Sequence, residues 1–195
     1  MTDLVEKDEY LSAGAHIGMR EKTAQMDDFI FKVRPDGLCV LDVEQTDERI
    51  EVAGKFLSRF DNIVVVSRKL NGQKPIEEFS EVIDAKAIAG RFLPGTLTNP
   101  AFPEYFDMDV IVITDPLADR QALLEAIKRR IPIIALCDTY NDLDFVDLII
   151  PVNNKGRRSL ALVYYLMARE ILKNRGEIEE DEDFDYEIED FQSSE

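Results

Sequence analysis

Three short runs in this chain, 63–66, 110–113 and 133–136, are wholly apolar and rich in β-branched residues. None of them alternates apolar with polar residues, as a strand with one face in water does. Segments with the apolar spacing of an α-helix lie between the runs. Strands that are apolar on both faces and are joined by helices are typical of a parallel sheet covered on both sides. With right-handed crossovers, the sequence predicts a doubly wound α/β domain of three layers.

The rest of the chain fills in this layout. Apolar residues recur at helical spacing in five segments, and polar or Gly/Pro-containing stretches separate them. Pro35-Asp36-Gly37 lies between two short apolar runs, which indicates a β-hairpin. The expected helices are 4–16, 44–59, 75–83, 117–130 and 159–173, and the expected strands are 29–33, 38–41, 62–67, 85–89, 110–113, 133–136 and 148–150.

The end of the chain has a different composition. Between Glu177 and Glu195 there are eleven acidic residues and no basic one. The whole chain has a net charge of −17, and the first 176 residues, with 23 basic and 29 acidic side chains, carry only −6 of it. A segment so charged buries too little apolar surface to offset its chain entropy. We therefore expect one α/β domain over 1–176 and a disordered acidic tail over 177–195.

The positive charge of the domain is clumped rather than spread. Composition alone does not predict a nucleic-acid partner, because nucleic-acid-binding domains usually have a clear basic surplus. Local basic patches stay open as binding surfaces. The clusters are Arg20 with Lys22, Lys32 with Arg34, Arg68 with Lys69, Lys128 with Arg129 and Arg130, and Lys155 with Arg157 and Arg158.

Several features bear on the cellular compartment. The chain has no run of about 18 apolar residues, so no segment is expected to span a membrane. Its first residues are acidic and lack the basic-then-apolar order of a secretory signal. Cys39 and Cys137 each lie in an apolar run and are expected to be buried thiols in a reducing compartment. Together these features predict a cytoplasmic protein.

Three aspartates, Asp42, Asp115 and Asp138, directly follow expected strands. Open parallel sheets bind ligands beyond the carboxyl ends of their strands, and three carboxylates there suit Mg²⁺. An enzyme or nucleotide-binding domain is therefore the alternative function. Helix capping is favoured instead, because Asp42 has Gln45 three residues on and Asp115 precedes Pro116.

Other signals of catalysis or cofactor binding are missing from the sequence. No glycine-rich nucleotide-binding motif follows a strand, and no His or Cys residues have the spacing of a zinc site. The single histidine, His16, lies between Gly14 and Gly18 and is expected to be a hydrogen-bonded residue of a tight turn. The sequence predicts no catalytic residue, no metal, no cofactor and no small-molecule substrate.

Two loops are better suited to binding. Residues 91–100 combine a cation, an exposed-looking aromatic ring, hydroxyls and an amide, which suits phosphate, sugar or backbone contacts. A loop stiffened by prolines explains this segment equally well. Residues 151–159 place Lys155, Arg157 and Arg158 at a helix N-terminus, where cations oppose the macrodipole and an anion is favoured. We favour anion binding over a set of solvated side chains at this second loop.

Five stretches of the sequence, in register, resemble the family of the universal second small-subunit ribosomal protein, in its archaeal and eukaryotic branch. They include a Thr-Asp-Pro segment and a Gly-Thr-Leu-Thr-Asn loop, in which Leu97 stands where the family has an aromatic residue. Together they cover residues 11 to about 175. The stretches are 11–18, 91–99, 112–119, 131–139 and 146–156.

This resemblance implies a flavodoxin-like fold and a structural role in translation and subunit assembly, without enzymatic activity. It implies small-subunit rRNA and neighbouring ribosomal proteins as partners, and no membrane. Only the short segment 68–84 lies where bacterial members have a long helical insertion, so contacts of that insertion do not transfer. Because rRNA supplies phosphate, the rRNA-binding candidates are Arg20, Lys22, Arg91, Thr98, Asn99, Lys155, Arg157 and Arg158.

Overall fold

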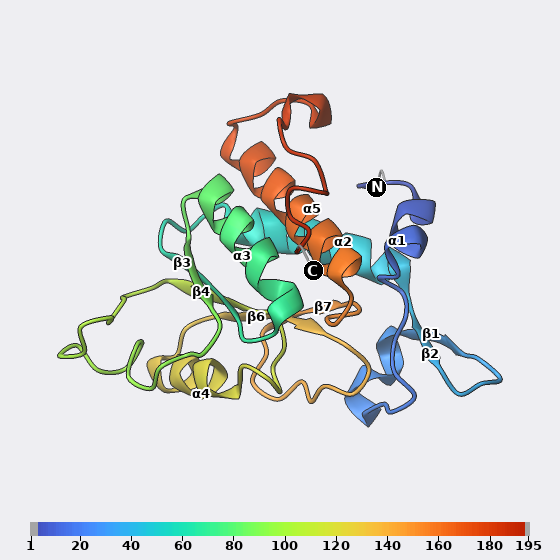
Figure 1. Ribbon diagram of the computed structural model, residues 1–195, viewed down its shortest axis with the longest axis horizontal. Helices are drawn as coiled ribbons and strands as arrows, with labels where there is room; N and C mark the ends of the chain where they lie inside the picture. Colours follow the sequence, from blue (N-terminus) through green and yellow to red (C-terminus); the bar gives the residue numbers. More distant parts are fainter. Residues whose placement is uncertain (1–3, 194–195) are drawn as a thin grey trace.

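The computed structural model describes residues 4–193. Its centre is a five-stranded sheet made of β3 (Ile63–Ser67), β4 (Lys86–Ala89), β5 (Val110–Ile113), β6 (Ile133–Cys137) and β7 (Leu148–Pro151). All five strands are parallel, in the order β4-β3-β5-β6-β7 (Figure 1). Counted within the sheet, this is the order 2-1-3-4-5 of flavodoxin-like doubly wound folds. The expected fold class is confirmed.

Four helices cover the two faces of the sheet: α2 (Val43–Leu57), α3 (Leu70–Ile83), α4 (Arg120–Arg129) and α5 (Arg157–Arg175). α2, α3 and α5 pack on one face, and α4 packs on the other (Figure 1). Successive residues of β3 enter different cores, since Val65 packs with the α5 side and Val64 with the α4 side. This double burial explains why the strands are apolar without alternation. Within residues 4–193, no helix combines the length and apolarity needed to cross a membrane.

The N-terminal part adds a small layer beside the sheet, formed by α1 (Lys7–Ala13), the 3-10 helix η1 (Ala24–Phe29), β1 (Ile30–Val33) and β2 (Cys39–Leu41). β1 and β2 form the expected antiparallel hairpin. Gly37 in its turn has φ 86°, a left-handed conformation that favours glycine. η1 was not expected, because its two buried residues, Met26 and Phe29, are too few to show a helical period.

Two expectations concern single residues. Cys39 and Cys137 are free and buried, as expected. His16 does lie in a turn after α1, where its carbonyl accepts the N–H of Leu41 at 2.8 Å. However, the imidazole Nδ1 is buried and has no hydrogen-bond partner in the described part of the chain. His16 is thus a hydrogen-bonded residue of a turn, as expected, through its backbone rather than through this ring nitrogen.

α3 begins at Leu70 rather than at Pro75, where the sequence analysis starts it. Its first turn lies very close to the end of β3, since a Cβ on Gly72 would be 2.2 Å from Ser67 Oγ. Glycine lowers helix propensity, so this residue hides the helix start in the sequence, while only glycine fits the close approach.

The segment after α5 lies against the body of the protein. α5 ends at Gly176, which has φ 76°, and the chain then turns back along the helix (Figure 1). Phe184 and Phe191 are 7% and 0% exposed, and their rings contact Tyr165 at centroid distances of 5.1 and 5.9 Å. The expected disorder rests on the acidic residues of this segment, whereas the packing involves its aromatic residues. The domain boundary after Gly176 stays a prediction, for which truncation is the test.

Candidate nucleic-acid interface

The carboxyl ends of the five parallel strands lie at one edge of the sheet, which we call the carboxyl edge. Four cations distant in sequence lie on the loops of this edge. Arg68 and Lys69 follow β3, Arg91 follows β4, and Lys155 follows β7. The topology therefore brings Arg91 and two of the basic clusters of the sequence to the same side of the molecule.

The segment that contains Arg20 and Lys22 reaches the same edge by pairing with the loop after β6. The N–H of Met19 donates to Thr139 Oγ1 at 3.0 Å, and this hydroxyl donates to the carbonyl of residue 21 at 2.8 Å. Arg20 is exposed. Lys22 is exposed as well, but its ammonium group pairs with Asp27 at 2.7 Å. Arg20 is thus the freer of these two rRNA-binding candidates.

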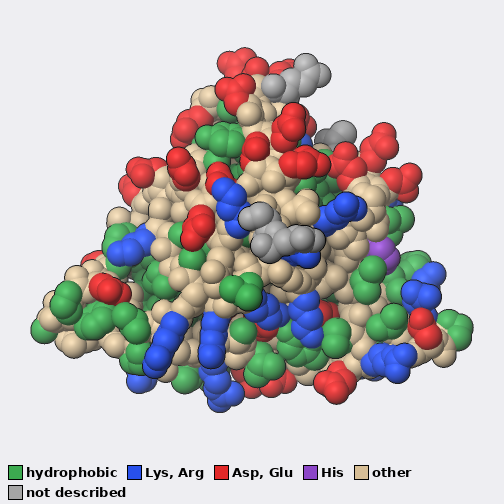
Figure 2. Space-filling model, viewed as in Figure 1, with side chains coloured by type: hydrophobic (Ala, Val, Ile, Leu, Met, Phe, Trp, Pro, Cys, Tyr) green, Lys and Arg blue, Asp and Glu red, His purple; other side chains and the backbone are tan. Residues whose placement is uncertain are grey.

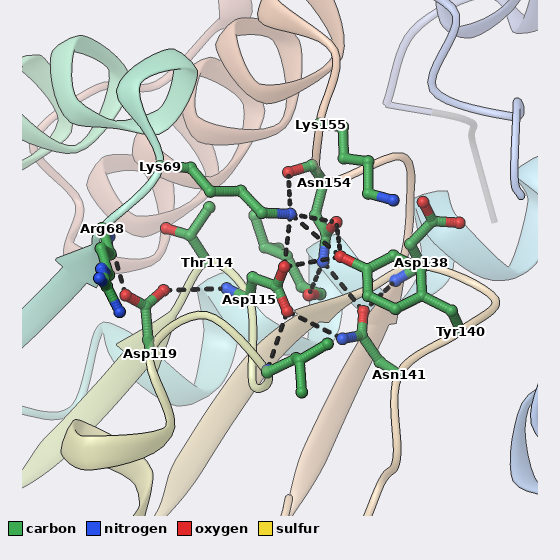
Figure 3. Close-up of polar contacts among 12 residues, drawn as sticks. Arg68, Lys69, Thr114, Asp115, Asp119, Asp138, Tyr140, Asn141, Asn154 and Lys155 are labelled. Carbon is green, nitrogen blue, oxygen red and sulfur yellow. Dashed lines mark hydrogen bonds and ion pairs between the residues drawn. The ribbon is translucent and has the colours of Figure 1, made fainter.

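A hydrogen-bonded network ties the carboxyl edge together (Figure 3). Asp115, which is 1% exposed, forms an ion pair with Lys69 and accepts the Tyr140 hydroxyl at 2.6 Å. Asn141 Nδ2 donates to the other carboxylate oxygen at 2.8 Å. The Lys69 ammonium group also donates to Asn154 Oδ1 at 3.0 Å and to the Tyr140 hydroxyl at 3.1 Å. Loops after β3, β5, β6 and β7 are thereby held in one arrangement.

Asp115 is a structural residue in this network. Burial by itself raises the pKa of its carboxyl group, but the bonds from Lys69 and Tyr140 outweigh burial and hold that pKa below its usual range. The expectation that Asp115 caps the following helix is wrong. The N-cap of α4 is Asp119, and Asp115 instead accepts the N–H of Leu117 at 2.9 Å in a separate turn.

The three strand-end aspartates do not share a site. Asp42 follows the hairpin and caps α2 as expected, by accepting the N–H of Glu44 at 3.1 Å. Asp138 accepts the N–H of Thr139 at 2.7 Å, its other oxygen is buried without a partner, and burial raises its pKa. Among residues 4–193, no three His, Cys, Asp or Glu side chains gather to hold a metal ion. The geometry gives the Mg²⁺-dependent alternative no support.

The N-terminus of α5 carries the cations that the sequence analysis singles out. Asn153 Oδ1 accepts the N–H of Lys155 at 3.1 Å, and the first turn of the helix contains no acidic residue. Arg158 is exposed and Arg157 is half-buried, and neither forms an ion pair with another described residue. The Lys155 ammonium group lies 3.9 Å from the centroid of the Tyr140 ring, a cation–π contact that fixes its position.

One carboxylate fixes the loop after β4. Glu125 of α4, which is 2% exposed, accepts the N–H of Gly95 at 2.7 Å, the N–H of Leu97 at 3.1 Å and the hydroxyl of Thr98 at 3.1 Å. Burial alone would raise the pKa of Glu125, but these bonds and one from Gln121 lower it. The Thr98 hydroxyl is therefore engaged inside the protein, which makes Thr98 the weakest of the candidates.

The remaining candidates of this loop, Arg91 and Asn99, are exposed. Phe92, taken as exposed in the sequence analysis, is 7% exposed and belongs to the core on the α4 side. In the sequence, Arg68 is visible only as part of a basic cluster, and Glu125 carries no sign of its role. The i, i+4 pair of Gln121 with Glu125 looks like an ordinary solvated helix face in the sequence, so only the fold reveals the role of Glu125.

Opposite charges are separated along α5. Figure 2 shows acidic side chains gathered at the top, over the segment that follows α5, and Lys and Arg side chains below them. Cations in the second half of α5 are paired with this segment: Arg169 lies 3.3 Å from Asp181, and Lys173 contacts the same carboxylate. The acidic segment thus neutralises the end of α5 that is far from the carboxyl edge.

Comparison with known proteins identifies the family of this chain. The sequence profile described as ribosomal protein S2 matches residues 10–102 and 107–174. The small ribosomal subunit protein uS2 of Picrophilus torridus is 53% identical over 191 residues, which are 97% of this chain and 96% of that protein. The uS2 proteins of Thermoplasma acidophilum and Thermoplasma volcanium are each 54% identical over 192 residues, at the same coverage. The resemblance seen in the motifs is confirmed, and the chain belongs to the ribosomal protein S2 family.

Proposed function

We propose that this protein is a structural constituent of the small ribosomal subunit in the cytoplasm, where it binds rRNA and neighbouring ribosomal proteins. The observation that carries the proposal is the match to small-subunit relatives over 97% of the chain. The family is one of structural proteins rather than enzymes. At the ends of β5, β6 and β7, the carboxyl edge is occupied by the network around Asp115.

The carboxyl edge supplies the chemistry for rRNA. Arg157 and Arg158 lie beside the first-turn N–H groups of α5, which have no intrahelical acceptors. Two guanidinium groups and the positive end of the helix dipole repel one another, and a phosphate relieves that repulsion. Lys155 is held close by, over the Tyr140 ring. This end of α5 is therefore our first choice for a contact with the rRNA backbone.

The other candidates rank by their freedom to bind. Arg20, Arg91 and Asn99 are exposed, and neither arginine has an ion-pair partner among the described residues. Lys22 must leave Asp27 to meet a phosphate, and the Thr98 hydroxyl is bonded to Glu125. Asp181 of the acidic segment pairs with Arg169 and Lys173, away from the N-terminus of α5, so this part of the segment is left for solvent or protein neighbours.

Incorporation into subunits tests the proposal. The protein is expressed in cells of a close relative, and lysates are sedimented to separate small subunits from the soluble pool. The unmodified chain should sediment with small subunits, and Arg157→Ala with Arg158→Ala should incorporate less while unfolding at the same denaturant concentration. A control with Arg59→Ala and Lys128→Ala removes two exposed cations that lie away from the carboxyl edge.

Salt dependence tests the nature of the contact. Each rRNA phosphate contact that is lost should flatten the slope of log affinity against log salt by roughly 0.7–0.9. An unmodified chain that stays in the soluble pool would contradict the ribosomal role. A variant at Arg157 and Arg158 that assembles like the control at every salt concentration would leave the role intact and show that α5 is only a solvated helix end.

A further inference from the structure

A polar pocket of about 330 Å³ lies on the carboxyl edge, at the ends of β3 and β4. Arg68, which follows β3, and Arg91, which follows β4, both line it. Both arginines are exposed, and neither forms an ion pair with another residue of the described range 4–193. Two guanidinium groups without an ion-pair partner in this range therefore share one cavity.

The backbone holds these two arginines at fixed positions. Ser67 and Gly90 immediately precede them, and the N–H of Gly90 donates to the carbonyl of Ser67 at 2.8 Å. Beyond Arg91, the loop is held by the bond from the Gly95 N–H to the carboxylate of buried Glu125. The backbone of the pocket is thus ordered before any ligand arrives, which lowers the entropic cost of binding.

The same pocket lies at the N-terminus of α4, since Ala118, Asp119 and Gln121 also line it. Asp119 is the N-cap residue, but its side chain does not cap α4. It accepts the N–H of Arg68 at 2.8 Å and the N–H of Asp115 at 3.2 Å instead (Figure 3). The first turn of α4 also has no acidic residue. Its free N–H groups and the helix dipole therefore favour an anion at this end.

We propose that this pocket binds a phosphate group, which is held between the Arg68 and Arg91 side chains and the first turn of α4. Guanidinium groups match the oxygen geometry of phosphate through paired hydrogen bonds, and helix N-termini bind the same group. The source of the phosphate rests on the proposed function: it is the backbone of small-subunit rRNA. A free phosphate monoester offers the same chemistry, and the two sources are separated by experiment.

The Asp119 carboxylate is the one negative group that lines the pocket. Burial raises its pKa to about 7, an effect that the two N–H donors oppose in part. An anion should therefore bind more tightly at pH 6, where Asp119 is mostly neutral, than at pH 8. Sulfate is the suitable probe because its charge is constant over this range. The charged side chains near Asp119 are those of Arg68, Lys69, Arg91, Asp115 and Arg120.

Titration of the full-length protein with sulfate, followed by NMR of backbone amides and arginine Nε–H groups, tests the pocket directly. We expect saturable shifts at residues 120–122 and at the side chains of Arg68 and Arg91. Arg68→Gln with Arg91→Gln should weaken sulfate binding roughly tenfold or more, as expected for lost charge-assisted bonds. The charge-matched control, Arg59→Gln with Lys128→Gln, should bind as the unmodified protein does. Chemical-shift changes that do not saturate with sulfate, or that persist in the pocket variant (Arg68→Gln with Arg91→Gln), would overturn the proposal.

Sedimentation of the same variants identifies the source of the phosphate. If the pocket variant loses sulfate binding and incorporates less into small subunits than the control does, rRNA is the source. Loss of sulfate binding with unchanged incorporation overturns rRNA as the source and assigns the pocket to a small phosphate compound. Sulfate binding is measured without ribosomes. If the pocket proposal is wrong, the sulfate titration fails; if the ribosomal role is wrong, the unmodified chain does not sediment with small subunits.

Discussion

The N–H of Gly95 donates to the Glu125 carboxylate at 2.7 Å, and this bond joins the loop after β4 to α4. The same carboxylate accepts the N–H of Leu97 and the hydroxyl of Thr98. Glu125→Ala would leave these donors unpaired, so we expect the free energy of unfolding to fall by about 2–4 kcal/mol. Urea denaturation measures the change. Glu77→Ala, at an exposed position of α3, is the control and should change it by less than about 0.5 kcal/mol.

The stabilisation by Glu125 should also depend on pH. Hydrogen bonds outweigh burial and lower the pKa of Glu125 in the folded protein. A carboxyl group with a lowered folded pKa stabilises the fold above its unfolded pKa of about 4.3, and that stabilisation is lost as the pH falls through the folded pKa. The difference in unfolding free energy between the unmodified protein and Glu125→Gln should therefore be larger at pH 6 than at pH 3. An equal difference at both pH values would contradict this account.

Removing Lys69 alone from its ion pair with Asp115 should destabilise the fold. Asp115 is almost completely buried, so Lys69→Met leaves a buried carboxylate without its cation. We expect a loss of about 3–5 kcal/mol in the free energy of unfolding. Adding Asp115→Asn removes the buried charge and should restore part of the loss. A double variant that is less stable than Lys69→Met alone would show that the charge itself is not the cause.

Asp119 should have the opposite pH dependence to Glu125. Burial raises its pKa to about 7, so the folded protein binds this proton more tightly than the unfolded chain does. Its contribution to stability is complete below an unfolded pKa of about 3.9 and declines as the pH rises to about 7. The unmodified protein should therefore have its largest advantage over Asp119→Asn near pH 4 and a smaller one at pH 8. Denaturation curves at pH 4, 6 and 8 measure this difference in unfolding free energy. A difference that increases from pH 4 to pH 8 would contradict the prediction.

The aromatic residues after α5 should stabilise the fold. Phe191 is fully buried and contacts Tyr165, so Phe191→Ala should lower the free energy of unfolding by about 3 kcal/mol. Glu189→Ala is the control, because Glu189 is exposed and its side chain forms no ion pair with another described residue. Truncation after Gly176 should leave a folded body of lower melting temperature. If Phe191→Ala and the truncated chain both keep the melting temperature of the unmodified protein, the segment is the disordered tail that its acidic composition predicts.

The sequence was sufficient for the layers of the fold but not for its carboxyl edge. The apolar run 63–66 reveals a doubly buried strand, because both faces of it meet a core. By contrast, Lys69 and Asp115 are 46 positions apart, and only the neighbouring positions of β3 and β5 bring them together. Right-handed crossovers restrict the topology without fixing which strands are neighbours. The pocket between Arg68 and Arg91 likewise depends on the pairing of β3 with β4.

For capping residues too, a contact between distant positions could not be predicted from the sequence. Asp42 could be identified as a cap from the sequence, because its acceptor role is satisfied two residues away. Glu125 could not, because the N–H of Gly95 lies 30 positions earlier in the chain. Phe184 and Phe191 were hidden for another reason: the acidic residues around them dominate the composition of the segment.

The separation of charge along α5 has a consequence for a protein whose net charge is −17. α5 has 19 residues and is therefore about 28 Å long. At an ionic strength of about 0.1 M, screening reduces electrostatic interactions over a Debye length of roughly 10 Å. A phosphate in contact with Arg157 or Arg158 thus lies about two screening lengths from Asp181, which pairs with Lys173 near the other end of the helix. Its binding is therefore governed by the local field of the first helical turn, and the acidic residues around Asp181 contribute little to it.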